Sequence, residues 1–132
     1  MESLSQKVAN QALQTIKEKN PENKKDLAKC AYFVRYSIQK AIIGGNNFDV
    51  STGILRAKDY GPWLQKMGYQ PTKKTYQNAS IGDVAVLENT KNHYYGHIAI
   101  YCGQGKWVSD FEQNCFYIYK DGTKPPYIIY SL

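Results

Sequence analysis

The stretch that decides the fold is Asp26-Leu27-Ala28-Lys29-Cys30-Ala31-Tyr32-Phe33-Val34-Arg35, which sets a cysteine near the start of a helix. Asp26 is a good N-cap residue for such a helix. The apolar residues that follow recur at steps of three and four, the period of one helix face: Leu27, Ala31, Val34, Ile38 and Ala41. We therefore predict a helix that starts at Asp26, ends near Ile42 and buries this face.

Cys30 lies about one turn into the predicted helix, where the partial positive charge of a helix N-terminus favours a thiolate over a thiol. The positive charges of the lysines at positions 24, 25 and 29 also favour the thiolate form of Cys30. A cysteine on a helix is also commonly a small buried apolar residue. A later motif, Tyr95-Gly96-His97-Ile98-Ala99-Ile100-Tyr101, offers a base on a strand and favours the interpretation of Cys30 as a nucleophile.

The composition is that of one compact domain. The chain has 132 residues, of which 42% are hydrophobic, so we expect a single domain over residues 1–132. The net charge of +6 favours anionic partners such as nucleic acid, acidic lipid or an acidic wall polymer. The 12 tyrosines suit glycans, peptides and bases equally and do not discriminate among them.

Residues 1–7 contain no apolar segment, so we expect no secretory signal, and no apolar run is long enough to span a bilayer. The three cysteines, Cys30, Cys102 and Cys115, have no CxxC spacing and are odd in number. Neither a zinc site nor a disulfide framework is indicated, and no metal or cofactor is expected. Whether Cys102 pairs with Cys115 stays open.

Helical periodicity gives way to strand patterns along the chain. Helices are predicted over residues 4–19, over the Cys30 segment and over 57–67; strands are predicted over 84–87, 97–102, 106–111, 116–119 and 127–130. Helices followed by strands indicate an α+β fold, with N-terminal helices packed on an antiparallel β-meander.

A third group for a catalytic site follows from strand geometry. If the hairpin centres on residues 104–105, His97 lies opposite Glu112 and diagonal to Asp110, and all three share one face of the sheet. Either carboxylate could accept a proton from one imidazole nitrogen and leave the other to take the thiol proton. A one-residue slip in register would move both carboxylates to the opposite face.

These residues also have ordinary structural interpretations. His97 could be a half-buried strand histidine with a routine hydrogen bond, and Asp110 and Glu112 could form a solvated strand face. Their coincidence with a cysteine at a helix start favours a catalytic site. His93 lies in a polar loop and is expected to be exposed.

The motifs DLAKCAYFVRY, YGHIAIY and KWVSDFEQ together resemble the NlpC and CHAP superfamily of papain-like cysteine amidases. Members of that superfamily place a cysteine at the start of a helix packed on a meander, a histidine at the start of a strand and a polar residue on the neighbouring strand. The segment from Ile81 to Ala85 is similar to the strand that often precedes this histidine. By this resemblance Asp110, rather than Glu112, is the third residue.

The resemblance implies a papain-like NlpC/CHAP fold and a cysteine amidase or endopeptidase that cleaves an amide bond in peptidoglycan stem peptides, with Cys30, His97 and Asp110 as the catalytic residues. The small size and absent signal are most similar to amidase effectors of type VI secretion systems. This implies synthesis in the cytoplasm, export by a secretion machine, action in the periplasm or wall of a target cell, and a cognate immunity protein. Neither a nucleic-acid partner nor membrane insertion is expected of such an enzyme.

Two other functions stay open. The same Cys–His pair could act on a protein target as a deamidase or protease. Alternatively, the chain could be a non-catalytic basic module that binds nucleic acid or glycan through its tyrosines. The binding module predicts salt-sensitive affinity for nucleic acid and no effect of Cys30→Ala.

Overall fold

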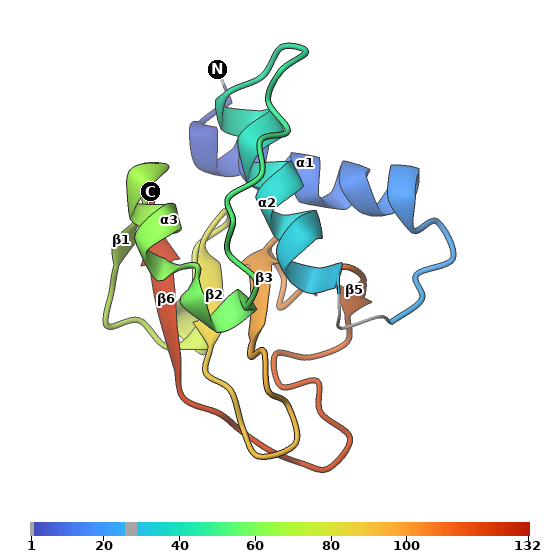
Figure 1. Cartoon of the computed structure of the whole chain (residues 1–132), viewed down its shortest axis with the longest axis vertical. Helices are drawn as coiled ribbons and strands as arrows, with labels where there is room; N and C mark the ends of the chain where they lie inside the picture. Colours follow the sequence, from blue (N-terminus) through green and yellow to red (C-terminus); the bar gives the residue numbers. More distant parts are fainter. Residues whose placement is uncertain (1, 26–28) are drawn as a thin grey trace.

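Helices cover one face of an antiparallel sheet in the computed structural model, which describes residues 2–25 and 29–132 (Figure 1). The helices are α1 (Leu4–Lys19), α2 (Cys30–Ile42) and α3 (Gly61–Lys66), with 3-10 turns η2 (Ala57–Asp59) and η3 (Tyr76–Asn78). The strands are β1 (Gln70–Pro71), β2 (Val84–Leu87), β3 (His97–Tyr101), β4 (Trp107–Val108), β5 (Glu112–Gln113) and β6 (Tyr127–Ser131). The predicted α+β class, with N-terminal helices on an antiparallel meander, is confirmed.

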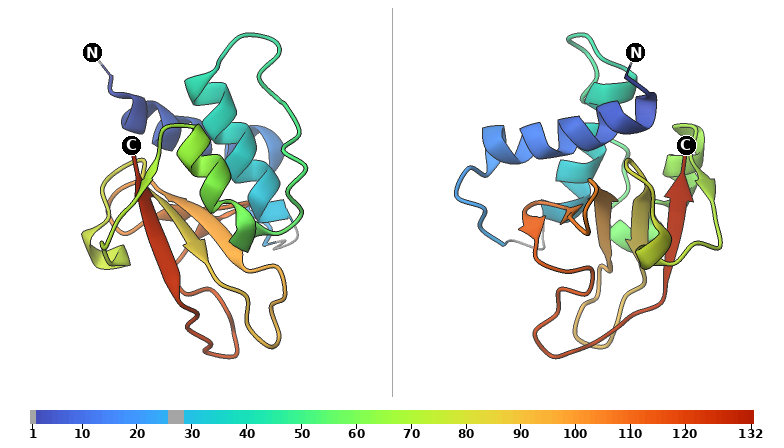
Figure 2. Two further views of the ribbon diagram at one scale, coloured as in Figure 1. Left: turned by 60° about the vertical axis from the view of Figure 1, so that its left-hand side comes forward. Right: turned by 180° about the vertical axis from the view of Figure 1, so that it is seen from behind.

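The strand order across the sheet is β1-β6-β2-β3-β4-β5. Strands β2 to β5 follow one another as a meander, and β6 returns to pair with the free side of β2. Figure 2 shows that α1 and α2 lie across the same side of this sheet, whereas the loop between β2 and β3 and the long segment before β6 extend beyond its far end. The start of β3 lies at that end, so loops from distant parts of the chain surround it.

The core has two layers because side chains on the strands alternate between the faces. On the helix side, Ile98 and Ile100 pack with apolar residues of α1 and α2. On the opposite face, Ala99 and Trp107 pack with aromatic residues of the loops, including Phe116. The segment that contains Phe116 was predicted as a strand, and that prediction is wrong: it folds as an irregular loop that covers this second face.

The hairpin between β3 and β4 differs from the prediction by one residue. Tyr101 pairs with Trp107, whereas a turn centred on residues 104–105 would have paired Cys102 with Trp107. The cause is the turn itself, because Gly103, Gln104 and Gly105 all adopt positive φ angles and form a three-residue connection. The chain then reverses at residues 109–111, so the strand predicted over 106–111 is only two residues long.

Three further expectations concern the N-cap of α2, the pairing of the cysteines and a membrane-spanning helix. The predicted N-cap Asp26 lies outside the described residues, and Lys29 occupies the N-cap position of α2. Cys30, Cys102 and Cys115 are all free thiols, so Cys102 and Cys115 do not pair. Within residues 2–25 and 29–132, no helix combines the length and the apolar character needed to cross a bilayer.

Candidate active site

Cys30 is the first residue of α2, which packs against β3. The side chain is only 3% exposed, and the backbone N–H of Ile98 hydrogen-bonds toward its sulfur. Ile98 directly follows His97 in β3, so the backbone next to the predicted base contacts the predicted nucleophile. No hydrogen bond joins the two side chains among the described residues. Catalytic hydrogen bonds are often long without substrate and tighten when it binds.

The Cys30 thiol is protonated in the resting protein. Burial raises its pKa to about 12 and the negative charge of Asp110 acts in the same direction, whereas the backbone N–H groups of Ile98 and Ala31 oppose the shift. The expectation that the helix start and the nearby lysines favour a thiolate is therefore wrong. The cost of burying a charge outweighs the attraction of the helix terminus.

His97 is the first residue of β3 and is 1% exposed. Gly96 before it has a φ angle of +72°, and a Cβ atom there would collide with the carbonyl oxygen of Leu87, so this turn requires glycine. Burial lowers the pKa of His97 from 6.5 to about 4. The imidazole is therefore neutral near pH 7 and able to accept a proton.

Gln113 on β5 decides which imidazole nitrogen accepts that proton. Its Oε1 lies 2.8 Å from His97 Nε2, and its amide NH₂ group donates to the carbonyl oxygens of Cys115 at 3.0 Å and Phe116 at 3.4 Å. Because the NH₂ group is used by these carbonyls, Oε1 must be the acceptor and Nε2 must carry the hydrogen. Nδ1 keeps the lone pair, and it is buried with no hydrogen-bond partner in the described part of the chain.

The structure places the two predicted third residues elsewhere. Neither Asp110 nor Glu112 hydrogen-bonds to His97. Glu112 is partly exposed and pairs with Lys106 at 3.0 Å. Asp110 is 1% exposed in the turn between β4 and β5, where its charge acts on Cys30. The assignment of Asp110 as the residue that orients His97 rests on the wrong register, and the contact is made by Gln113.

Gln113 could have been found from the sequence, because it is the last residue of the quoted KWVSDFEQ motif. An amide is a known third group in Cys–His sites. The sequence reasoning considered only carboxylates and therefore passed over it.

A second residue that the sequence reasoning missed is Tyr119, in the loop before β6. Its side chain is 7% exposed, and its ring stacks on His93 with centroids 3.5 Å apart. His93 was expected to be exposed, but this stacking leaves its side chain only 23% exposed. Burial raises the pKa of Tyr119 to about 12, and the negative charge that Cys30 can carry contributes to the shift.

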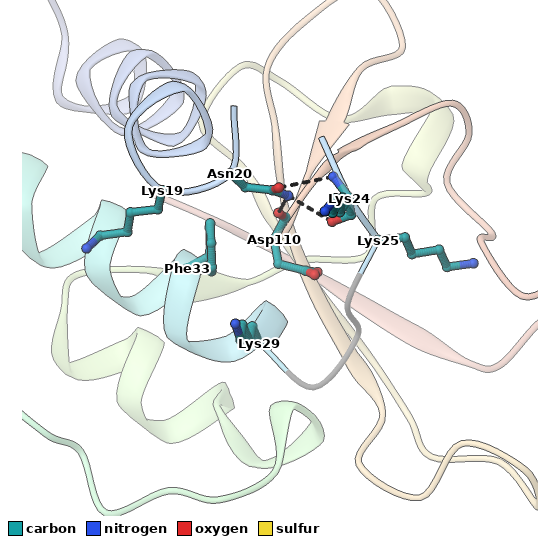
Figure 3. Close-up of a pocket in the computed structure, with 7 residues that line it drawn as sticks. All are labelled: Lys19, Asn20, Lys24, Lys25, Lys29, Phe33 and Asp110. Atoms are coloured by element: carbon teal, nitrogen blue, oxygen red, sulfur yellow. Dashed lines mark hydrogen bonds between the residues drawn. The ribbon is translucent and has the colours of Figure 1, made fainter. Parts of the chain in front are cut away.

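A basic cavity of about 350 Å³ opens next to the start of α2 (Figure 3). Asn20 lines this cavity and donates to the backbone carbonyl of Asp110 at 2.6 Å. Phe33 and Asp110 line the wall nearest to α2. The rest of the lining is strongly cationic and contains Lys19, Lys24, Lys25 and Lys29. The cavity can therefore accept an anionic group close to Cys30.

In residues 2–25 and 29–132, no three His, Cys, Asp or Glu side chains cluster closely enough to hold a metal ion. The site residues are instead typical of nucleophilic acyl chemistry: a cysteine, a neutral histidine of defined tautomer and an orienting amide.

The low pKa of His97 predicts that stability falls in acid. Between pH 6.5 and about pH 4 the unfolded chain binds a proton on His97 and the folded chain does not, so the free energy of unfolding decreases as the pH falls through this range. The shift corresponds to roughly 3 kcal/mol. Urea denaturation at pH 7.5 and pH 4.5 measures it. His97→Gln, which cannot titrate, should remove most of the difference; an unchanged difference would assign it to other groups.

No protein-family model and no curated protein sequence match this chain. Two solved structures match it, both of the type VI effector–immunity complex Tae3–Tai3 from Ralstonia pickettii. The native complex gives a TM-score of 0.73 at 32% identity, covering 96% of this chain and 97% of the matched chain. The selenomethionine form gives 0.71 at 32% identity, covering 94% and 98%. With this identity over nearly the full length of both chains and the same fold, the chain belongs to the Tae3 family of type VI effectors.

Proposed function

We propose that this protein is a peptidoglycan amidase or endopeptidase, with Cys30 as nucleophile, His97 as general base and acid, and Gln113 as the residue that orients His97. The observation that carries the proposal is the His97–Gln113 hydrogen bond, which leaves Nδ1 as the basic nitrogen of a histidine whose neighbour in β3, Ile98, hydrogen-bonds toward the Cys30 sulfur. Membership of the Tae3 family and the resemblance to NlpC and CHAP amidases support the same chemistry.

The first half-reaction forms a thioester. Cys30 Sγ attacks the amide carbonyl of a stem peptide, and its proton moves to His97 Nδ1. Because the thiol pKa is about 12 and the imidazole pKa about 4, an ion pair is unfavourable at rest, so proton transfer accompanies the attack. The imidazolium then gives this proton to the leaving amine as the carbon–nitrogen bond breaks.

The second half-reaction hydrolyses the thioester. Neutral His97 takes a proton from water, the hydroxide attacks the acyl carbon, and the proton returns to the departing sulfur. In both halves negative charge develops on the carbonyl oxygen. The backbone N–H of Cys30 is one of the N–H groups at the start of α2 that have no partner within the helix, so it can donate to this oxygen.

The charge of the chain supports this substrate class, as does the family. Stem peptides and the wall that carries them are anionic, whereas this chain has a net charge of +6 and a cavity with four lysines next to the catalytic cysteine. Such a field raises the encounter rate with the wall and favours binding of a peptide carboxylate close to the scissile bond. Asp110 contributes to this cavity wall, and its buried carboxylate limits how many anionic groups fit.

The matched complexes support a proposal for the partner and for the site of action. The solved relatives are bound to an immunity protein, and we infer a cognate immunity protein for this chain as well. We also infer export by a type VI machine from the cell that makes the protein, and action in the periplasm or wall of the recipient cell.

Compartment-specific expression tests this function. With a secretory signal fused to it, the protein should lyse the host and release cleaved muropeptides, whereas cytoplasmic expression should leave the wall intact because the mature stem peptides lie outside the membrane. Mass spectrometry of the released fragments identifies the bond, and Cys30→Ala with the same signal is the matched control. Toxicity confined to the cytoplasm, with no cleaved muropeptides, would favour a protein target instead.

A further inference from the structure

The side-chain amide of Gln113 can occupy its position in two orientations, and the two give His97 opposite tautomers. In the structure, Gln113 Oε1 faces His97 Nε2 at 2.8 Å, so the hydrogen lies on Nε2. An amide rotated by 180° would present its NH₂ group to Nε2, which would then have to be the acceptor. The hydrogen would move to Nδ1, and Nδ1 would lose the lone pair that the proposed reaction requires.

Two backbone carbonyl oxygens select the orientation that the structure shows. The Gln113 NH₂ group donates to the carbonyl oxygens of Cys115 at 3.0 Å and Phe116 at 3.4 Å. In the rotated amide, Oε1 would face these two oxygens, which would set acceptor against acceptor. Gln113 is only 5% exposed, so little water is available to relieve that conflict. The tautomer of His97 therefore depends on where the backbone of residues 115–116 lies.

The ring of Phe116 anchors this backbone, because residues 114–119 belong to neither a helix nor a strand. The ring is buried and stacks on Tyr76 of η3, with centroids 4.5 Å apart and 5° between the planes. It also makes edge-to-face contacts with Trp107 at 5.0 Å and with Tyr127 at 4.8 Å. Tyr76 is itself held in place, since its backbone N–H donates to Tyr127 Oη at 3.0 Å.

We propose that Phe116 is a positioning residue: its ring, stacked on Tyr76, fixes the loop carbonyls that orient the Gln113 amide, and so keeps the hydrogen of His97 on Nε2. Phe116 and Tyr76 act on His97 only through Gln113 and touch no reacting atom. This inference rests on the proposed function, in which Nδ1 of His97 is the base, and it names the aromatic pair that keeps this nitrogen basic.

Tyr76→Leu and Phe116→Leu each remove one ring of the stack but keep the carbonyl oxygens that accept from Gln113. We expect the kcat for muropeptide hydrolysis to fall about 10-fold in each, with KM nearly unchanged, because the tautomer of His97 is no longer uniform. Imidazole ¹⁵N chemical shifts should report hydrogen on both Nδ1 and Nε2 in these variants. Tyr76→Phe keeps the stacked ring and is the matched control, with the kcat and the ¹⁵N pattern of the wild type.

A double-mutant cycle separates this role from a general loss of packing. In the Gln113→Ala background, Phe116→Leu should cause no further fall in kcat, because the amide through which it acts is gone. Phe48→Leu is the packing control, since Phe48 makes an aromatic contact with Tyr36, with centroids 5.1 Å apart, in a different part of the fold. This variant should lower the melting temperature and leave kcat and the ¹⁵N pattern of His97 unchanged.

An unchanged ¹⁵N pattern in Phe116→Leu, or an equal fall in kcat with and without Gln113, would overturn the role of Phe116. Tyr76 is only partly buried, so Tyr76→Leu decides the question by the same two criteria if Phe116→Leu does not fold. If the wild type hydrolyses no muropeptide, the proposed function fails, and the ¹⁵N patterns still decide whether Phe116 orients Gln113. A wild type with the hydrogen on Nδ1 would overturn both.

Discussion

Replacing Cys30 with alanine or serine should reduce the hydrolysis of purified muropeptides by at least about 10³-fold, the effect expected when the nucleophile of an acyl-transfer site is removed. Serine is close in size to cysteine, but its hydroxyl is much harder to ionise than a thiol. The helix start is retained in both variants, so circular dichroism and substrate binding should remain close to those of the wild type. Muropeptide turnover followed by mass spectrometry measures the loss.

Cys102→Ser and Cys115→Ser are the controls for this experiment, and both should keep most of the activity. Cys115 is exposed, whereas Cys30 is almost fully buried, so iodoacetamide should label Cys115 first even though Cys30 is the reactive residue in catalysis. Full activity in Cys30→Ala, or loss of activity only in one of the other two variants, would contradict the assignment of the nucleophile.

Gln113→Ala should lower turnover by about 10²- to 10⁴-fold, the range seen when a histidine loses the group that sets its tautomer. Without Gln113 Oε1, the hydrogen on His97 is no longer held on Nε2, and Nδ1 is no longer the defined base. Substrate binding should change less than kcat, because the group acts through His97 and not on the substrate. Imidazole ¹⁵N chemical shifts measure the tautomer directly. In the wild type they should report the hydrogen on Nε2 and not on Nδ1, whereas in Gln113→Ala the hydrogen should no longer be confined to Nε2.

Glu112→Ala is the matched control, since Glu112 neighbours Gln113 on β5 but pairs with Lys106. Its activity should be close to that of the wild type. Asp110→Asn tests the assignment made from the sequence. A larger loss in Asp110→Asn than in Gln113→Ala, with the ¹⁵N pattern of His97 unchanged, would return the main role to Asp110.

The parts of this protein that could be predicted from sequence are those encoded by local patterns. The 3.6-residue period of the helices and the apolar run of β2 specify elements whose existence does not depend on distant residues. The positions of Cys30 and His97 follow in the same way, because each lies at the start of such an element. The α+β class could be predicted as well, because it depends only on the order of helices and strands.

Tertiary structure alone decided the remaining features, because each depends on a small difference between distant segments. A turn of three residues instead of two shifts the register by one and replaces Asp110 and Glu112 by Gln113 as the partner of His97. Burial, which no local pattern reports, reverses the expected pKa shift of Cys30. The stacking of Tyr119 on His93 likewise depends on an irregular loop that no sequence period predicts.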